Sequence, residues 1–154
     1  MIKIIPAKKQ HVSELVILFE AYRTFYKKEI NIEKSTQFLE DRIENRESFI
    51  FIAIEITSEK IVGFVQLYPM FSSTRLDKIL ILNDLFVDAN FRGKAISQLL
   101  IDRCKLFAQD MNALELVLET QKSNVIGNQL YPKVGFELDT EHNYYSWTNP
   151  DYQF

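Results

Sequence analysis

A basic turn in the middle of the chain lies between a hydrophobic stretch and a helix-like pattern, an arrangement that can bind an anion. The segment LNDLFVDANFRGKAIS runs from Leu82 to Ser97, and its turn contains Arg92, Gly93 and Lys94. The first N–H groups of a helix have no acceptor inside it, and together with the helix dipole they attract negative charge. Gly93 permits a left-handed backbone and a close approach. Because an ordinary structural helix start has the same pattern, the residue types alone leave both interpretations open.

The elements that must position this turn can be predicted from the spacing of apolar residues. β-branched and aromatic runs indicate strands, and apolar residues that recur with helical spacing indicate helices. We predict strands at Lys3–Pro6, Ser48–Ile56, Ile61–Met70, Lys78–Val87, Ala113–Glu119, Gly135–Asp139 and Tyr144–Thr148. We predict helices at Ser13–Phe25 (with Ser13 as the N-cap), Glu33–Arg46, Ala95–Met111 and Val125–Lys133. The sum is an α/β (α+β) fold, in which a mixed, centrally antiparallel sheet of about six or seven strands is flanked by about four helices.

Length and composition favour one soluble globular domain that spans residues 1–154. The 18 basic and 21 acidic residues give a net charge of −3, which argues against a nucleic-acid partner. No apolar run is long enough for a signal peptide or a membrane span, so we expect no membrane partner. Cys104 is the single cysteine, which favours a reducing, cytoplasmic setting. This cysteine and the two histidines give no metal-ligand spacing, so we expect no metal.

Two separate motifs resemble the GNAT family of N-acetyltransferases. The segment LNDLFVDANFRGKAISQLLI is similar to the family's motif A, Arg/Gln-x-x-Gly-x-Gly/Ala, with Arg92 at its first position. Ala95 and Ser97 stand at the two small positions, and alanine favours a helix more than glycine does. The segment NVIGNQLYPKVGF, from Asn124 to Phe136, is similar to motif B, Asn-x-x-Ala-x-x-Leu-Tyr-x-x-x-Gly-Phe. Within the family, LNDLFV and the tail LDTEHNYYSW resemble the polyamine- and small-amine-acetylating branch and the yeast histone/polyamine acetyltransferases.

The resemblance implies acetyl-CoA as the co-substrate. The backbone of Leu85, Phe86 and Val87 would pair with the pantetheine amides, and the amide of Phe86 or Val87 would face the thioester oxygen. The pyrophosphate would lie at the turn and helix start formed by Arg92, Gly93, Lys94, Ala95, Ile96 and Ser97. Asn124 would bond to the pantetheine arm, and it is also suited to cap the helix that begins at Val125.

The implied reaction is direct attack of a neutral amine on the thioester within a ternary complex. It requires a base for the ammonium, a donor to the developing oxyanion and an acid for the leaving thiolate. Tyr131 matches the family tyrosine that lies near the sulfur and serves as general acid, and a phenol is protonated at neutral pH. We predict Asp84 as the base, because a carboxylate in an apolar strand needs a partner or a role. A structural carboxylate bonded to backbone is the alternative.

Asn83 and Asp84 are neighbours in one predicted strand, and alternation points their side chains to opposite faces. Only one of the two could then face the acceptor. If that residue is Asn83, the base lies elsewhere or is water. Glu119, at the end of the next strand, is the reserve candidate.

The leading hypothesis is therefore an acyltransferase that moves the acetyl group of acetyl-CoA to a primary amine of a small, cationic molecule or of a protein. The alternative is a catalytically weak or inactive acyl-CoA-binding module that acts as a sensor or partner. A nucleotide-binding domain is disfavoured, since the sequence contains neither GxxxxGK[ST] nor GxGxxG. Because homodimers are frequent in the family, the resemblance also raises the expectation of a homodimer.

Overall fold

The computed structural model describes residues 1–153. Its chain divides into two compact units, Met1–Glu119 and the segment that begins at Thr120. That one domain spans residues 1–154 remains a prediction.

The first unit contains a five-stranded sheet in the order β1-β2-β3-β4-β5. The strands are β1 (Ile2–Pro6), β2 (Phe49–Glu55), β3 (Lys60–Ser72), β4 (Asp77–Val87) and β5 (Glu115–Val117). Its helices are α1 (Val12–Phe25), α2 (Ile32–Glu44) and α3 (Ile96–Asp110), with short 3₁₀ turns η1 (Lys9–His11) and η2 (Ala89–Phe91). Strands β1 to β4 pair antiparallel in chain order, and β5 joins β4 in parallel. The predicted mixed α/β fold is therefore confirmed.

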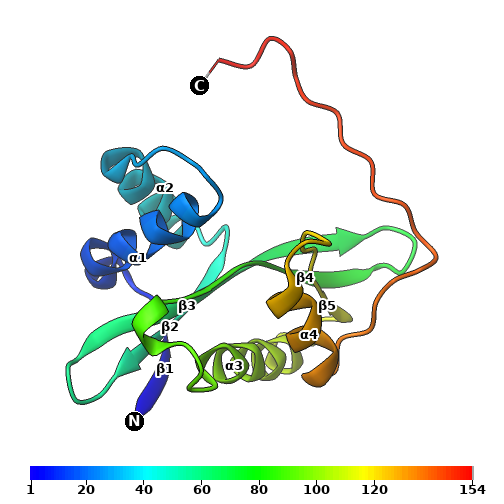
Figure 1. The fold of residues 1–154 in the computed structure, drawn as a ribbon. Helices are drawn as coiled ribbons and strands as arrows, with labels where there is room; N and C mark the ends of the chain where they lie inside the picture. Colours follow the sequence, from blue (N-terminus) through cyan, green and yellow to red (C-terminus); the bar gives the residue numbers. More distant parts are fainter. Residues whose placement is uncertain (154) are drawn as a thin grey trace. The chain divides into compact units, whose positions relative to one another are not determined.

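The helices of this unit cover both faces of the sheet. Figure 1 shows α1 and α2 on one side of β2 and β3 and α3 on the other. Alternation along β3 explains this, because Phe64 contacts Phe19 of α1 while the neighbouring Gly63 lies against Leu100 of α3. The core on the α1 face is a cluster of Val12, Leu15, Val16, Leu18, Phe19, Leu39, Ile50, Ile52, Ile61 and Phe64.

Strands β4 and β5 separate before β4 ends. Their pairing runs only from Ile79–Glu115 to Ile81–Val117. Strand β4 continues to Val87, and beyond Ile81 it keeps β3 as its partner on the other side. The segment 82–87 therefore presents one edge without a β5 partner, which gives the sheet an open notch directly before the basic turn.

The predicted bounds agree closely with most elements. Each predicted helix and each of the first five predicted strands begins and ends within two residues of its prediction. The predicted N-cap at Ser13 is wrong, because α1 begins at Val12 with His11 as its N-cap residue. The His11 ring accepts a hydrogen bond from the Lys8 N–H at 2.9 Å, which fixes the chain one residue earlier.

The second unit contains helix α4 (Val125–Lys133), which completes the four α-helices that the sequence predicts. After α4, the described chain from Phe136 to Gln153 forms neither helix nor strand. The predicted strands Gly135–Asp139 and Tyr144–Thr148 are therefore wrong, and the sheet has five strands rather than six or seven. A strand is stable only when a neighbour pairs with its backbone, and the described residues supply none. A turn also intervenes, since the Asp139 carboxylate accepts from the N–H groups of Glu141 and His142.

Candidate active site

The open edge of β4 presents particular backbone groups. The Asp88 N–H donates to the Val62 carbonyl at 2.9 Å, so Asp88 faces β3. Because backbone groups alternate along a strand, Phe86 also faces β3, and Leu85 and Val87 face the open edge. Of the two amides considered for the thioester oxygen, only that of Val87 therefore points to the notch.

The turn before α3 has an unusual backbone. Gly93 has φ of 76° and Ala95 has φ of 58°, so both lie in the left-handed region. Ala95 is the N-cap residue, and its carbonyl accepts the Leu99 N–H at 3.1 Å. The helix-propensity argument for Ala95 is therefore wrong, since the residue precedes the helix. Four turn residues, Arg92, Gly93, Lys94 and Ala95, are exposed. Ile96 is buried and Ser97 is half-buried, so the helix start is anchored by Ile96 and its N–H end faces outward.

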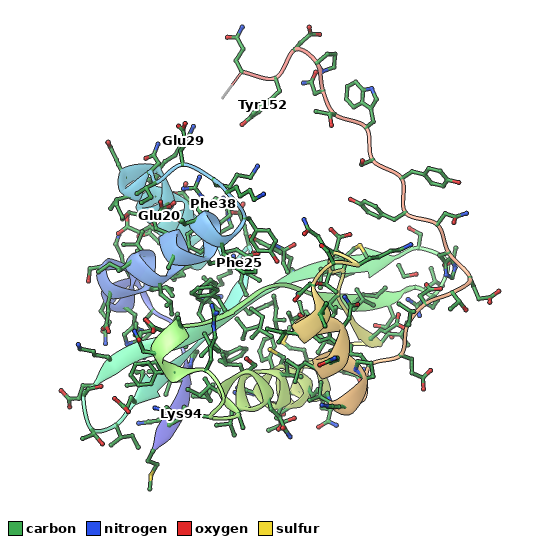
Figure 2. All side chains as sticks on the ribbon, in the orientation of Figure 1. Glu20, Phe25, Glu29, Phe38, Lys94 and Tyr152 are labelled. Atoms are coloured by element: carbon green, nitrogen blue, oxygen red, sulfur yellow. The ribbon has the colours of Figure 1, made fainter. Side chains whose placement is uncertain are left out.

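Both basic side chains of the turn rest on aromatic rings. The Arg92 Nε donates to the Val87 carbonyl at 3.2 Å, and its guanidinium carbon lies 5.5 Å from the centre of the Phe86 ring. The Lys94 Nζ lies 4.7 Å from the centre of the Phe91 ring. Figure 2 shows Lys94 near the start of α3. Arg92 thus ties the turn to the end of β4, and its other guanidinium N–H groups are still available to an anion.

Asp84 is buried within a chain of side-chain hydrogen bonds. Its side chain is 6% exposed, and Oδ2 accepts from Gln66 Nε2 at 2.8 Å. Oδ1 accepts from Asn83 Nδ2 at 3.1 Å. The Gln66 Oε1 in turn accepts from the Ser48 hydroxyl at 2.8 Å. The alternative interpretation expected backbone partners for this carboxylate, whereas the partners are side chains.

A β-bulge brings Asn83 and Asp84 together. Gln66 pairs with Asp84 and Leu67 pairs with Leu82, so Asn83 is an extra residue on β4. Alternation fails at a bulge, and the two neighbouring side chains are hydrogen-bonded to each other. The prediction that Asn83 and Asp84 point to opposite faces is therefore wrong.

Tyr68 also belongs to the surroundings of Asp84, and sequence reasoning missed it together with Gln66. Burial, and then the negative charge of Asp84, raises the pKa of Tyr68 to about 12. The available signal was two polar side chains two residues apart in an otherwise apolar central strand, because such spacing places both on one face.

The remaining predicted residues have these positions. Glu119 is exposed and lies two residues after the end of β5. In the second unit, Asn124 caps α4 as predicted, because its Oδ1 accepts the Gly127 N–H at 3.1 Å. Its Nδ2 donates to the Thr120 hydroxyl at 2.9 Å. Tyr131 is half-buried on α4, and its ring meets that of Phe136 edge-on at 5.9 Å.

Among residues 1–153, no three His, Cys, Asp or Glu side chains are grouped closely enough to hold a metal ion. None of the helices in the same range is both long and apolar enough to cross a membrane.

Comparisons with known proteins agree with this geometry. The model of the acetyltransferase (GNAT) family matches residues 15–136. The N-acetyltransferase YhfO of Bacillus subtilis (strain 168), which is described as uncharacterized, is 38% identical over 144 residues, 94% of this chain and 95% of the relative. A probable acetyltransferase of Haemophilus influenzae (strain ATCC 51907 / DSM 11121 / KW20 / Rd) is 33% identical over 137 residues, 89% of this chain and 91% of the relative.

Solved structures share the fold. The crystal structure of a probable acetyltransferase has a TM-score of 0.92 at 33% identity, covering 97% of this chain and 99% of that one. A predicted acetyltransferase of Clostridium acetobutylicum, solved with acetyl-CoA, has a TM-score of 0.76 at 19% identity, covering 95% and 96%, and shows the fold alone. The family model covers most of the chain and the two relatives exceed 30% identity over nearly their whole length. The chain therefore belongs to the acetyltransferase (GNAT) family.

Proposed function

We propose that the chain transfers the acetyl group of acetyl-CoA to a primary amine by direct attack in a ternary complex. The observation that carries the proposal is the open edge of β4 beside the turn that begins α3. This edge offers unpaired amides, and the turn offers outward N–H groups with two exposed cations, Arg92 and Lys94. Amides suit the pantetheine arm and the helix start suits a pyrophosphate, so the residues present fit acetyl-CoA.

The residues that would hold acetyl-CoA are Leu85 and Val87 at the open edge, the segment 92–97 at the helix start, and Asn124. Phe86 supports the site through its ring, on which the Arg92 guanidinium lies. Gly93 and Ala95 help because their left-handed backbone turns the chain into the helix without covering its N–H end. When bound, acetyl-CoA supplies the thioester that carries the acetyl group.

Three groups of the chain would handle charge and protons. Asp84 accepts a proton from the acceptor's ammonium, which leaves a neutral amine to attack the thioester, with Glu119 or water as the alternative base. The Val87 N–H donates to the thioester oxygen as negative charge develops there. Tyr131 donates a proton to the leaving sulfur.

The acceptor we propose is a small cationic amine, with a protein amine as the alternative. A row of aromatic rings extends from Phe86 to the surface. The distances between neighbouring ring centres are 6.0 Å from Phe86 to Tyr22, 5.1 Å from Tyr22 to Tyr26 and 5.2 Å from Tyr26 to Phe25. Figure 2 shows Phe25 on α1. Aromatic faces attract cations, which supports a cationic acceptor, as does the net charge of −3. We further propose that the protein acts in the cytoplasm as a homodimer.

One observation favours a second function, an acyl-CoA-binding module without turnover. Both carboxylate oxygens of Asp84 already accept side-chain hydrogen bonds. A carboxylate in that state can be purely structural, which would leave the chain without a base.

The deciding experiment begins with calorimetric titration of the protein with acetyl-CoA, beside dephospho-CoA as a control. Turnover is then followed by loss of thioester absorbance with a panel of polyamines, amino sugars, amino acids and peptides. We expect micromolar, stoichiometric binding and turnover with cationic amines. Absence of acetyl-CoA binding would overturn both functions, and binding without turnover for any amine would select the binding module.

Variants then test the proton roles. Asp84→Asn and Tyr131→Phe should each lower kcat about 100-fold or more, the usual size of general acid–base catalysis, and leave acetyl-CoA binding unchanged. Asp77→Asn, at an exposed carboxylate of the same strand, is the matched control and should leave kcat unchanged. Full activity of Asp84→Asn would transfer the role of base to Glu119 or water.

A further inference from the structure

The polar chain around Asp84 lies in the interior of the sheet. Gln66 is 1% exposed, and Ser48 and Asp84 are each 6% exposed. Burying such groups costs free energy unless each is hydrogen-bonded. Within the described residues, no buried side-chain nitrogen or oxygen lacks a partner. The chain Ser48–Gln66–Asp84 is therefore a completed buried network rather than a set of stray polar groups.

The network has a direction. An amide donates from its nitrogen and accepts at its oxygen, so the end that faces Asp84 matters. A carboxylate only accepts, so Asp84 Oδ2 takes the Gln66 Nε2 donor at 2.8 Å, and Gln66 Oε1 is left to accept from the Ser48 hydroxyl at 2.8 Å. A reversed amide would place its oxygen against the carboxylate.

The surroundings of the carboxylate contain no bonded cation. Among the described residues, no Lys or Arg forms an ion pair with Asp84. Its two hydrogen-bond donors, Gln66 and Asn83, are neutral amides. The charged and titratable groups that act on this corner are Tyr68 of β3, next to Asp84, and Arg42 of α2, whose guanidinium is paired with Glu47 at 2.6 Å. Among the described residues, the Asp84 carboxylate is thus held by neutral donors and has no ion-pair partner.

The bulge completes this arrangement. It adds Asn83 on β4 and brings the Asn83 amide to Asp84 Oδ1. Each carboxylate oxygen has two acceptor sites, so one donor on each leaves the second site available.

We propose that Gln66 is a positioning residue for Asp84 in acetyl transfer, and that the Ser48 hydroxyl holds the Gln66 amide in place. The carboxylate held in this way receives the ammonium of the acceptor. The inference rests on the proposed function, because it assigns Asp84 the part of base.

The test compares Gln66→Leu, Ser48→Ala and Ser48→Thr with the parent, in steady-state turnover and in acetyl-CoA titration. Gln66→Leu should lower kcat about tenfold, the size expected for one buried hydrogen bond to a charged group. Ser48→Ala should lower kcat less than Gln66→Leu does. Ser48→Thr, which keeps the hydroxyl, should have a kcat within about twofold of the parent's. The affinity for acetyl-CoA should stay constant in all three. Ser58→Ala, at an exposed serine outside the network, is the matched control.

Each outcome is decisive. The positioning role is overturned if a folded Gln66→Leu protein keeps the kcat of the parent. It is also overturned if Ser48→Thr does not recover the kcat that Ser48→Ala loses. If Gln66→Leu does not fold, the Ser48 pair decides alone, since a merely structural serine would change stability without changing kcat. A parent that binds acetyl-CoA but acetylates no amine overturns the proposed function and this inference together, whereas an active parent with indifferent variants overturns only this inference.

Discussion

Ala95 shows how a single residue can carry strain where a ligand is expected. It has φ of 58° at the N-cap of α3. For a residue with a Cβ, that left-handed conformation is less favourable by about 1–2 kcal/mol. Motif A usually has a small flexible residue there, so this chain keeps the backbone shape without the residue that adopts it freely.

Ala95→Gly should therefore raise the free energy of unfolding by about 1 kcal/mol, because glycine removes the strain but adds some entropy to the unfolded chain. Urea denaturation measures this change. Ala108→Gly, inside α3, is the matched control and should be destabilising by about 1 kcal/mol or more. If Ala95→Gly and Ala108→Gly lower the free energy of unfolding equally, Ala95 is not strained.

The prediction of individual site residues from the sequence succeeded where one segment suffices. The Asn124 cap depends only on the residues that follow it, and it is confirmed. The opposed faces of Asn83 and Asp84 were wrong, because a bulge is a property of two paired strands. The hydrogen bond between Gln66 and Asp84 was missed for the same reason, since it joins two paired strands.

At the scale of elements, α1 and α2 are joined by one buried carboxylate. Figure 2 shows Glu20 between these helices. Glu20 accepts hydrogen bonds from the Ser35 hydroxyl, from Arg23 Nη1 at 2.6 Å and from the Asn31 N–H at 2.8 Å. Burial raises the pKa of Glu20, but the hydrogen bonds from Ser35, Arg23 and Asn31 outweigh burial, so the net shift is downward.

This shift makes stability depend on pH in a defined direction. Since the pKa of Glu20 is lower in the folded chain, its contribution is present above the unfolded pKa and is lost as pH falls through the folded pKa. Glu20→Gln should lower the free energy of unfolding by about 1–3 kcal/mol at pH 7. The difference in unfolding free energy between variant and parent should become smaller below about pH 4. Urea denaturation at pH 7 and below about pH 4 measures this difference, with Glu29→Gln, at an exposed glutamate, as the control. A gap that stays constant on acidification would contradict the argument.

At the scale of the whole molecule, the sequence predicted the order and type of the helices and the first five strands, because each has a strong apolar period. It could not predict the fate of the last two strands. Their apolar pattern predicted strands, and this was wrong because pairing depends on a neighbour that no local pattern reveals.

The tail after α4 consequently leaves large apolar side chains exposed. They are Leu138, Tyr144, Tyr145, Trp147 and Tyr152. Exposed apolar groups in such number mark interaction surfaces. We therefore expect a dimer in sedimentation equilibrium at micromolar concentration, and a monomer when residues 137–154 are deleted. The same oligomeric state in both proteins would contradict the tail's part in assembly.

Cys104 has a practical consequence for the chemistry of the folded chain. It is the sole cysteine and is completely buried, and burial raises its pKa to about 12. Only a thiolate reacts with disulfide reagents such as Ellman's compound. The folded protein should give no colour with that reagent, and one equivalent should react after denaturation. The folded protein should thus give no signal in an assay for free thiols. If the proposed acetyl transfer takes place, every sulfhydryl detected would be coenzyme A, and any cysteine introduced on the surface could be labelled alone.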